Sequence, residues 1–353
     1  MYLLIGMIVG SMSLLEIYCK RWFPLLKGYM FFLLIVFLFI VVAYRQCGYD
    51  YDNYMSIYRV LHSSAWTENT NFLGIEPGYG FLNYICTSFR QLLIVMAFLS
   101  LSLYAAFVYK YSPLPFLSFF LLLSIVLYGG MMGQYRQSLA IGIVSMAVSL
   151  RKSRMSFLCL LAIAYLFHRT AAIAIILLFV PEKIYSLKFY LYLLLLSLVF
   201  HFVGEELLAV MSIVFPEKIQ SKLYTYAVTE AGKVFGFNLA MLLRILIFGY
   251  LWRYRLLIGQ YSYGYFFLNS YFVSLIFYLS FGFLPQLAGR GSLYFSVFEF
   301  ILPAMVIAKN KKAYCGILFF LFVSIYRQFS LFTGNGSDDY LPYHSAFFQL
   351  IGL

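Results

Sequence analysis

Long apolar runs separated by short polar connections make up almost the whole chain. Within each run the apolar positions are continuous and do not alternate, which is typical of membrane-spanning helices and not of the strands of a membrane barrel. Because lipid offers the backbone no hydrogen-bond partners, each run is expected to form an α-helix. The pattern predicts about twelve spans, at residues 2–18, 29–44, 91–108, 114–129, 137–150, 155–167, 171–181, 189–203, 237–252, 264–283, 293–308 and 313–326.

The runs at 155–167 and 171–181 are short, which favours tilted, kinked or re-entrant helices at these places. No soluble domain, low-complexity tract or internal repeat interrupts the series. We therefore expect an all-α polytopic membrane protein, with a single transmembrane domain over residues 1–353. Its longer connections lie near 45–90 and 204–236. Short interfacial or re-entrant helices are expected within such connections.

The composition agrees with this class. Hydrophobic residues make up 63% of the chain and charged residues 11%, whereas an average soluble domain has about 45–50% and about 25%. The net charge of +12 is concentrated in one set of alternate connections, among them the run RKSR at 151–154. Since basic connections stay in the cytoplasm, this set marks the cytoplasmic face, and its charge reflects topology instead of nucleic-acid binding.

The connections on the opposite, outer face carry all four histidines and seven isolated arginines. A guanidinium group binds phosphate oxygens through two parallel hydrogen bonds, so several of them together would hold a phosphate or pyrophosphate. The alternative for each arginine is contact with lipid headgroups or pairing with an acid. These arginines are Arg45, Arg59, Arg90, Arg136, Arg169, Arg290 and Arg327.

The first outer connection begins with CGYDYDNYMSIYR at 47–59. The pair Asp50 and Asp52 resembles the metal-binding acids of enzymes that use nucleotide sugars, but such donors are not available outside the cell. A sugar donor on this face would have to be carried by a lipid phosphate. Asp52 either caps the following helix or faces an acceptor sugar. That helix is predicted over 53–65, on the membrane surface, from apolar side chains at helical spacing, namely Met55, Tyr58, Leu61 and Ala65.

Further outer motifs each combine chemistry with a structural alternative. Glu76 precedes Pro77, so it is either a functional acid or an acid at the start of a helix. The stretch GGMMGQYR predicts a flexible turn before a helix that starts near Gln134, where Arg136 and free backbone amides would face an anion.

His168, next to Arg169, has the side chain best suited to accept a proton from a sugar hydroxyl near neutral pH. A lone histidine is otherwise a structural hydrogen-bonding group. Arg290 lies between Gly289 and Gly291, and glycines allow the backbone to approach a ligand closely.

The five cysteines have no zinc-binding spacing, and the chain contains no Walker, dinucleotide-binding, GxSxG or HExxH motif. We therefore expect a reaction without a metal or another cofactor. Cys47 and Cys86 both lie on the outer face, so a disulfide between them is left open.

The motifs GYDYDNY, EPGYGFLNY, YRQSLAI, HRTA, GRGSLYF and YLPYHSAFF occur in an order that resembles the EpsG-like family of polysaccharide polymerases. This family is grouped with the Wzy-like O-antigen polymerases of bacteria. The resemblance implies a multi-pass inner-membrane glycosyltransferase whose active site faces the periplasm. It also implies transfer of a growing glycan from undecaprenyl pyrophosphate onto a new lipid-linked repeat unit. Implied partners are this lipid-linked oligosaccharide, membrane lipids, and a chain-length regulator and a flippase of the same pathway, but no nucleic acid.

The resemblance is clearest at Asp52, Glu76, Arg136, His168 and Arg290. It implies that His168, Glu76 or Asp52 deprotonates the acceptor hydroxyl, with the choice among them open. The implied pyrophosphate ligands are Arg136, Arg169 and Arg290, with Tyr135 and Gln137 beside them and Arg59, Arg90 and Arg327 as a supporting rim.

Two other classes share part of this pattern. A flippase for lipid-linked oligosaccharides would need polar groups along a path through the bilayer, and the apolar runs contain few. A ligase that transfers the finished glycan to another acceptor would share the arginines and the histidine.

Overall fold

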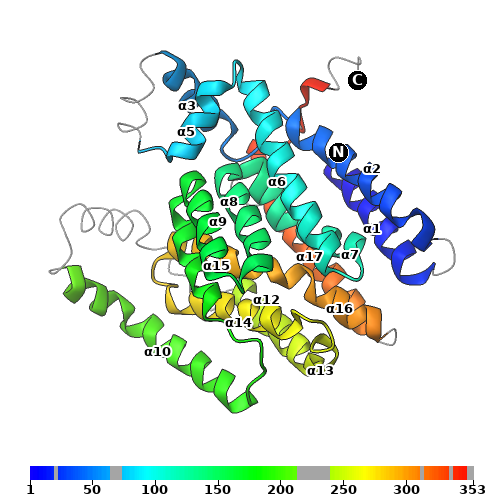
Figure 1. Ribbon diagram of the computed structural model, residues 1–353, viewed down its shortest axis with the longest axis vertical. Helices are drawn as coiled ribbons and strands as arrows, with labels where there is room; N and C mark the ends of the chain where they lie inside the picture. The colour runs from blue at the N-terminus through cyan, green and yellow to red at the C-terminus, as the bar shows by residue number, and fades with distance from the viewer. Residues whose placement is uncertain (20–22, 64–73, 213–238, 311–313, 334–336, 348–353) are drawn as a thin grey trace. The chain divides into compact units, whose positions relative to one another are not determined.

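The computed structural model of the protein describes residues 1–19, 23–63, 74–212, 239–310, 314–333 and 337–347. These ranges are largely helical (Figure 1), and apart from an isolated antiparallel bridge between Arg45 and Ser345 they contain no β-structure. Helices satisfy their backbone hydrogen bonds internally, as lipid requires. The all-α fold class predicted from the apolar runs is thereby confirmed.

The chain divides into two compact units, Met1–Leu178 with Pro303–Leu353, and Phe179–Leu302. A single transmembrane domain stays a prediction. In the first unit α8 is buried along almost its whole length, between α6 and α9, while α1 packs against α7. The helices of this unit are α1 Tyr2–Tyr18, α2 Phe23–Ala43, α3 Tyr51–Ser63, α5 Pro77–Ile85, α6 Phe89–Tyr111, α7 Pro115–Leu122, the π-helix η1 Leu123–Gly133, α8 Tyr135–Ala147, η2 Val148–Leu150, α9 Arg154–Phe167, the 3₁₀-helix η3 Arg169–Leu178, α17 Tyr314–Thr333 and η5 Ser337–Asp339.

In the second unit α14 packs against α10, α12 and α15. Asn269 ties the start of this unit together, since its amide donates to the carbonyl oxygens of Pro181 and Lys183 and its oxygen accepts from the Tyr190 hydroxyl. The helices are α10 Leu187–Ser212, α12 Leu239–Arg253, α13 Arg255–Ile258, α14 Gly264–Ser280, α15 Pro285–Ser296 and η4 Val297–Phe300, and α16 Leu302–Lys309 begins at the boundary between the units.

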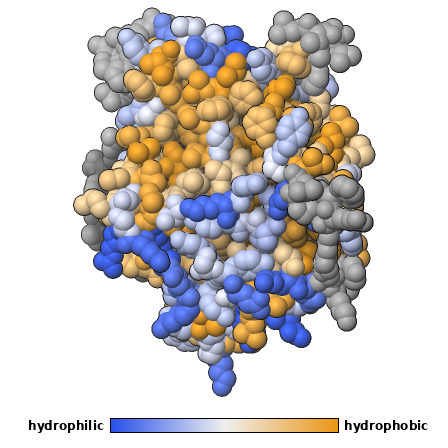
Figure 2. All heavy atoms as spheres, turned by 45° about the vertical axis from the view of Figure 1, so that its right-hand side comes forward, coloured by the Kyte–Doolittle hydropathy of each residue, from blue (hydrophilic) through white to orange (hydrophobic). Residues whose placement is uncertain are grey.

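Among the described residues, six helical segments are long and apolar enough to cross a membrane. Figure 2 shows large apolar areas on the surface, and side chains such as Leu3 are 83% exposed, which is expected where lipid is the solvent. The chain is a multi-pass membrane protein, and about twelve spans remain a prediction. The six segments are Leu26–Ala43, Phe89–Tyr111, Pro115–Gly133, Leu187–Gly204, Pro285–Lys309 and Gly316–Thr333.

Two predicted connections contain helices. The helix expected over 53–65 is confirmed as α3, which buries Tyr54, Tyr58 and Leu61 along one face. Its place on the membrane surface stays a prediction, and residues 64 and 65 lie outside the described part. The connection expected near 204–236 begins inside α10, which continues to Ser212, and residues 213–238 lie outside the described part.

The flexible turn expected at the glycines of GGMMG is wrong, because the chain continues there as the π-helix η1 up to Gly133. These glycines allow close packing. A Cβ atom on Gly130 would lie 3.0 Å from the Ser138 hydroxyl, and one on Gly133 would lie 2.9 Å from the Tyr340 hydroxyl. The break before α8 falls at Gln134 alone.

The segment after α2 is held by the last described residues of the chain. Backbone amides of Gln46 and Gly48 donate to the carbonyl oxygens of His344 and Asp339, and Ala346 donates to Tyr44. These bonds join residues about 300 positions apart in the sequence. They hold in place the segment that follows α2 and contains Arg45.

Gly48 is a position that no other residue fits. Its φ is +128°, and an added Cβ would overlap the carbonyl oxygen of Met132. We expect Gly48→Ala to lower the free energy of unfolding by about 3 kcal/mol, measured by SDS titration. The matched control is Gly74→Ala, at φ +63° with nothing within 4 Å, for which we expect about 1 kcal/mol. Equal losses in the two variants would contradict the proposed overlap.

Candidate active site

Glu76 stands at the start of α5, and its carboxylate joins two other elements of the first unit. Oε2 accepts a hydrogen bond from Nη1 of Arg136 at 2.8 Å, and Oε1 lies 3.4 Å from Nδ1 of His168. We call these three residues the Glu76 cluster. Each was predicted as a site residue from the sequence, and the structure shows that they lie together.

Local structure explains why the Glu76 side chain is available for this contact. Glu76 is the N-cap residue of α5 and Pro77 is the first helical residue, as the sequence indicated, but the side chain makes no capping hydrogen bond. The carboxylate turns instead toward Arg136, the second residue of α8. The capping alternative for Glu76 therefore describes its backbone position and not the role of its side chain.

A close approach of α5 to α9 brings Glu76 to His168. A Cβ atom on Gly78 would lie 2.8 Å from the carbonyl oxygen of Leu166, so only glycine allows this spacing. Leu166 is near the end of α9, and His168 is its C-cap residue. Glu76 is two residues before Gly78, and His168 is two residues after Leu166. The close contact between Gly78 and Leu166 therefore brings Glu76 and His168 together.

The cluster is largely shielded from solvent, with side-chain exposures of 8% for Glu76, 15% for His168 and 21% for Arg136. Burial raises the pKa of the Glu76 carboxyl, but the hydrogen bond from His168 and the charge of Arg136 lower it by more, from 4.5 to about 2. Glu76 is therefore a carboxylate at neutral pH, and a weak base.

This depressed pKa predicts a pH dependence of stability. Since the folded-state pKa of Glu76 lies below the unfolded value, its contribution is present above about pH 4.5 and is lost as the pH falls toward 2. The linked loss is about 3 kcal/mol. We expect acid to destabilise the wild-type protein more than Glu76→Gln over this interval, as measured by unfolding of both proteins at each pH.

Three nitrogen atoms of the cluster are buried without a hydrogen-bond partner, Nδ1 and Nε2 of His168 and Nε of Arg136. Nδ1 faces the Glu76 carboxylate at 3.4 Å, whereas Nε2 faces no acid among the described residues. A buried donor or acceptor without a partner costs about 1–3 kcal/mol. Nε2 of His168 and Nε of Arg136 are therefore the atoms of the cluster that a ligand would satisfy.

Three tyrosines line one side of the cluster, and the sequence reasoning did not assign two of them. The guanidinium of Arg136 lies over the rings of Tyr54 and Tyr79, 5.3 and 5.2 Å from the centroids. The Tyr79 hydroxyl is 2.6 Å from the Tyr135 hydroxyl, and Arg45 lies 5.7 Å from the Tyr135 ring. The signal for Tyr54 and Tyr79 was their presence in GYDYDNY and EPGYGF; their burial could not be read from those letters.

Arg45 is the most buried of the predicted outer arginines, with 1% exposure. Nε donates to the carbonyl oxygen of Met132 and Nη1 to that of Val42. Arg90 also serves the backbone, since its Nη1 donates to the carbonyl oxygens of Ala43 and Arg45. These two arginines hold the end of α2 in place.

Other predicted site residues lie apart from these contacts. Asp52 is exposed in the first turn of α3, and Arg59 is exposed and contacts Met55 on the same helix. Arg169 is exposed and donates to the carbonyl oxygen of Gly74 at 3.1 Å. Gly74 is two residues before Glu76, so this bond holds an accessible cation against the segment that leads to Glu76.

The remaining predicted residues are distributed over both units. Tyr135 and Gln137 are buried, with 2% and 3% exposure. Arg327 is half-buried in α17, and Arg290 is half-buried in α15 of the second unit. Their roles toward substrate stay predictions.

The structure shows no disulfide between the two outer cysteines and no group of metal ligands among the described residues. Cys47 and Cys86 are buried free thiols. Within the described ranges no three His, Cys, Asp or Glu side chains are grouped as metal ligands would be.

The sequence matches the model of the EpsG family over residues 28–345. The chain therefore belongs to the EpsG family, which is a Wzy-like polymerase family. This makes it a polysaccharide polymerase-like membrane protein. No curated protein and no solved structure matches the chain.

Proposed function

We propose that the protein is a polymerase that extends a lipid-linked glycan. The donor is a growing glycan on undecaprenyl pyrophosphate, and the acceptor is a new lipid-linked repeat unit. The reaction takes place at the periplasmic face of the bacterial inner membrane, which is the face opposite the basic connections. The observation that carries the proposal is the state of His168, whose Nδ1 faces the Glu76 carboxylate while Nε2 has no partner.

This arrangement makes His168 the base of choice among the three candidates. A carboxylate beside Nδ1 favours the tautomer with a proton on that nitrogen, which leaves the lone pair on Nε2 to accept a proton. The Glu76 carboxyl, with its pKa lowered to about 2, is better suited to orient the ring and to stabilise the imidazolium. Asp52 is exposed and has no contact with the cluster.

The reaction then balances as a direct displacement. The acceptor hydroxyl oxygen forms a bond to the anomeric carbon of the donor sugar, and its proton moves to Nε2 of His168. The bond from that carbon to the pyrophosphate oxygen breaks, and its electron pair leaves with the pyrophosphate.

Charge develops on the leaving group in this step, and fixed cations stabilise it. Arg169 is an exposed cation that follows His168 directly and donates to the carbonyl oxygen of Gly74, two residues before Glu76. Arg136 is held by Glu76, so its first role is to keep that carboxylate ionised, and only its partnerless Nε is left for a ligand. Arg290 stays a predicted pyrophosphate ligand on the strength of its motif.

The test uses purified protein and synthetic lipid-linked repeat units. A ladder of longer lipid-linked glycans is expected, and transfer of a single finished glycan to another acceptor would show a ligase. Movement of the lipid across vesicles without any ladder would show a flippase. Either of these two results overturns the polymerase proposal.

A further inference from the structure

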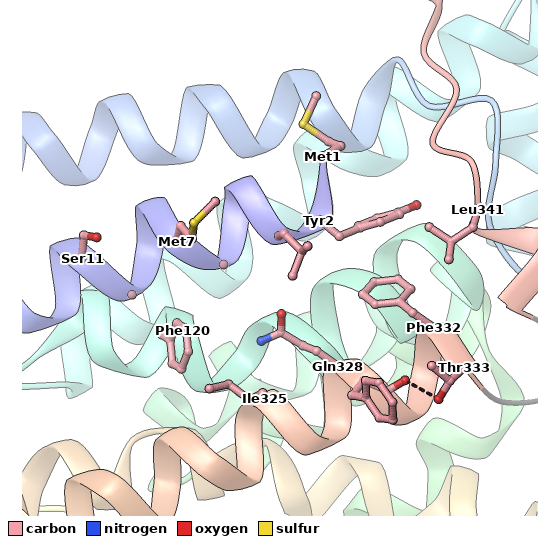
Figure 3. Close-up of a pocket in the computed structure, with 14 residues that line it drawn as sticks. Met1, Tyr2, Met7, Ser11, Phe120, Ile325, Gln328, Phe332, Thr333 and Leu341 are labelled. Atoms are coloured by element: carbon pink, nitrogen blue, oxygen red, sulfur yellow. Dashed lines mark hydrogen bonds between the residues drawn. The ribbon is translucent and has the colours of Figure 1, made fainter.

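A lipid-facing groove runs between α1 and α17 in the first unit, over a floor that includes Phe120 of α7. Its cavity volume is about 720 Å³. Figure 3 shows Tyr2 and Met7 on one wall and Ile325 and Phe332 on the other. A pocket of several hundred Å³ is large enough for a sizeable apolar ligand.

Glycines on α1 let side chains of the groove lining approach this helix closely. A Cβ atom on Gly6 would lie 3.4 Å from Oε1 of Gln328, and one on Gly10 would lie 3.2 Å from Cε2 of Phe120. The two glycines are about one helical turn apart, so larger side chains at these positions would narrow the groove along one wall.

The length of the groove corresponds to one leaflet. On α1 the lining runs from Met1 to Ser11, a rise of about 15 Å at 1.5 Å per residue. The hydrocarbon core of a bilayer is about 30 Å thick. The groove therefore takes a lipid chain from one face to about the middle of the membrane.

The end of the groove at Tyr2 is linked to the surroundings of the Glu76 cluster through contacts and neighbouring residues in the sequence. The Tyr2 hydroxyl donates to the carbonyl oxygen of Tyr340 and lies 3.5 Å from Sγ of Cys47. Cys47 is two residues from Arg45, whose guanidinium lies over Tyr135. Tyr135 in turn precedes Arg136 of the cluster.

We propose that this groove binds the polyprenyl chain of the lipid-linked substrate and so guides its phosphate end toward the Glu76 cluster. The inference rests on the proposed function. The single apolar channel, its length of about one leaflet and its end beside the segment that carries Cys47 and Arg45 favour a polyprenyl chain. A phospholipid would place only one of its two chains there.

The test measures binding of radiolabelled undecaprenyl phosphate to the purified full-length protein, without turnover. Ile325→Trp fills the groove from α17, where Ile325 is 59% exposed and its replacement does not disturb the core. We expect affinity to fall about tenfold through lost packing contacts. The matched control is Phe322→Trp, at a position on the same helix that is 62% exposed and outside the groove lining, and it should bind like wild type.

Chain length separates the groove from the phosphate site. Ile325 lies eight residues below Thr333 at the mouth, about 12 Å along α17, beyond the reach of geranyl phosphate. Affinity for this short probe should be unchanged in Ile325→Trp. Gly10→Leu, which fills the groove from α1, should reproduce the loss for the long probe alone.

Three results would overturn the groove assignment: unchanged affinity of Ile325→Trp for the long probe, equal losses for both probes, or equal competition by dioleoylphosphatidylglycerol. Because no turnover is needed, binding that depends on chain length supports the groove even if no glycan ladder forms. A ladder with wild-type affinity in Ile325→Trp would remove the groove and leave the polymerase.

Discussion

His168→Ala is expected to lower kcat for glycan extension by about a thousandfold while substrate binding stays within about twofold of wild type. The reason is that Nε2, which has no other partner in the described structure, is the proton acceptor for the attacking hydroxyl. Without it the proton must pass to water, and the positively charged ring that Glu76 would stabilise cannot form. The measurement is single-turnover formation of the first extended product, alongside binding of the lipid-linked substrate.

Two variants serve as controls for this result. His344→Ala changes an exposed histidine and should retain wild-type activity. Asp52→Asn changes the exposed acid of α3 and should do the same. If Asp52→Asn lost about a thousandfold in activity while His168→Ala remained active, the base would be Asp52 and the assignment of His168 would be wrong.

The pair Glu76 and Arg136 should show strong coupling in stability. Glu76→Gln leaves a guanidinium largely buried beside neutral groups, and Arg136→Met leaves a buried carboxylate, so each change is expected to cost about 3 kcal/mol. The double variant should cost clearly less than the sum, because neither charge is then left alone. SDS-titration unfolding of the four proteins gives the coupling free energy.

The activities of the same four proteins give a second, independent test. Glu76→Gln removes the negative charge from Nδ1 of His168 and should reduce kcat even where the double variant regains stability. Additive stability losses would mean that the 2.8 Å contact contributes nothing, and a fully active double variant would mean that Glu76 does not act on His168.

The helices were predictable because lipid imposes a strong constraint. Tyr2–Tyr18 of α1 coincides with the first predicted span, and within the described ranges each other predicted span falls on one to three helices. The turn at GGMMG was not predictable in the same way, since glycine serves both flexibility and close packing. The decisive partners of those glycines lie elsewhere in the chain, Ser138 in α8 and Tyr340 directly after η5.

The candidate residues were predictable one at a time, but their partners were not. Arg136 was expected to face an anion from a turn, yet the nearest anion is the Glu76 carboxylate, 60 positions away. Arg90 was expected on a basic rim, but its guanidinium holds backbone carbonyls. Only tertiary packing, here the contact at Gly78 and Leu166, decides which of several isolated polar groups meet.

The pairing of residues 44–48 with 339–346 has a consequence for biosynthesis. The segment that carries Arg45 obtains its backbone partners from residues about 300 positions later in the sequence. These bonds cannot form during synthesis until residues 339–346 have been made, after the helices from α3 to α17. The backbone around Arg45, whose guanidinium lies over the Tyr135 ring, therefore closes late in the folding of the first unit.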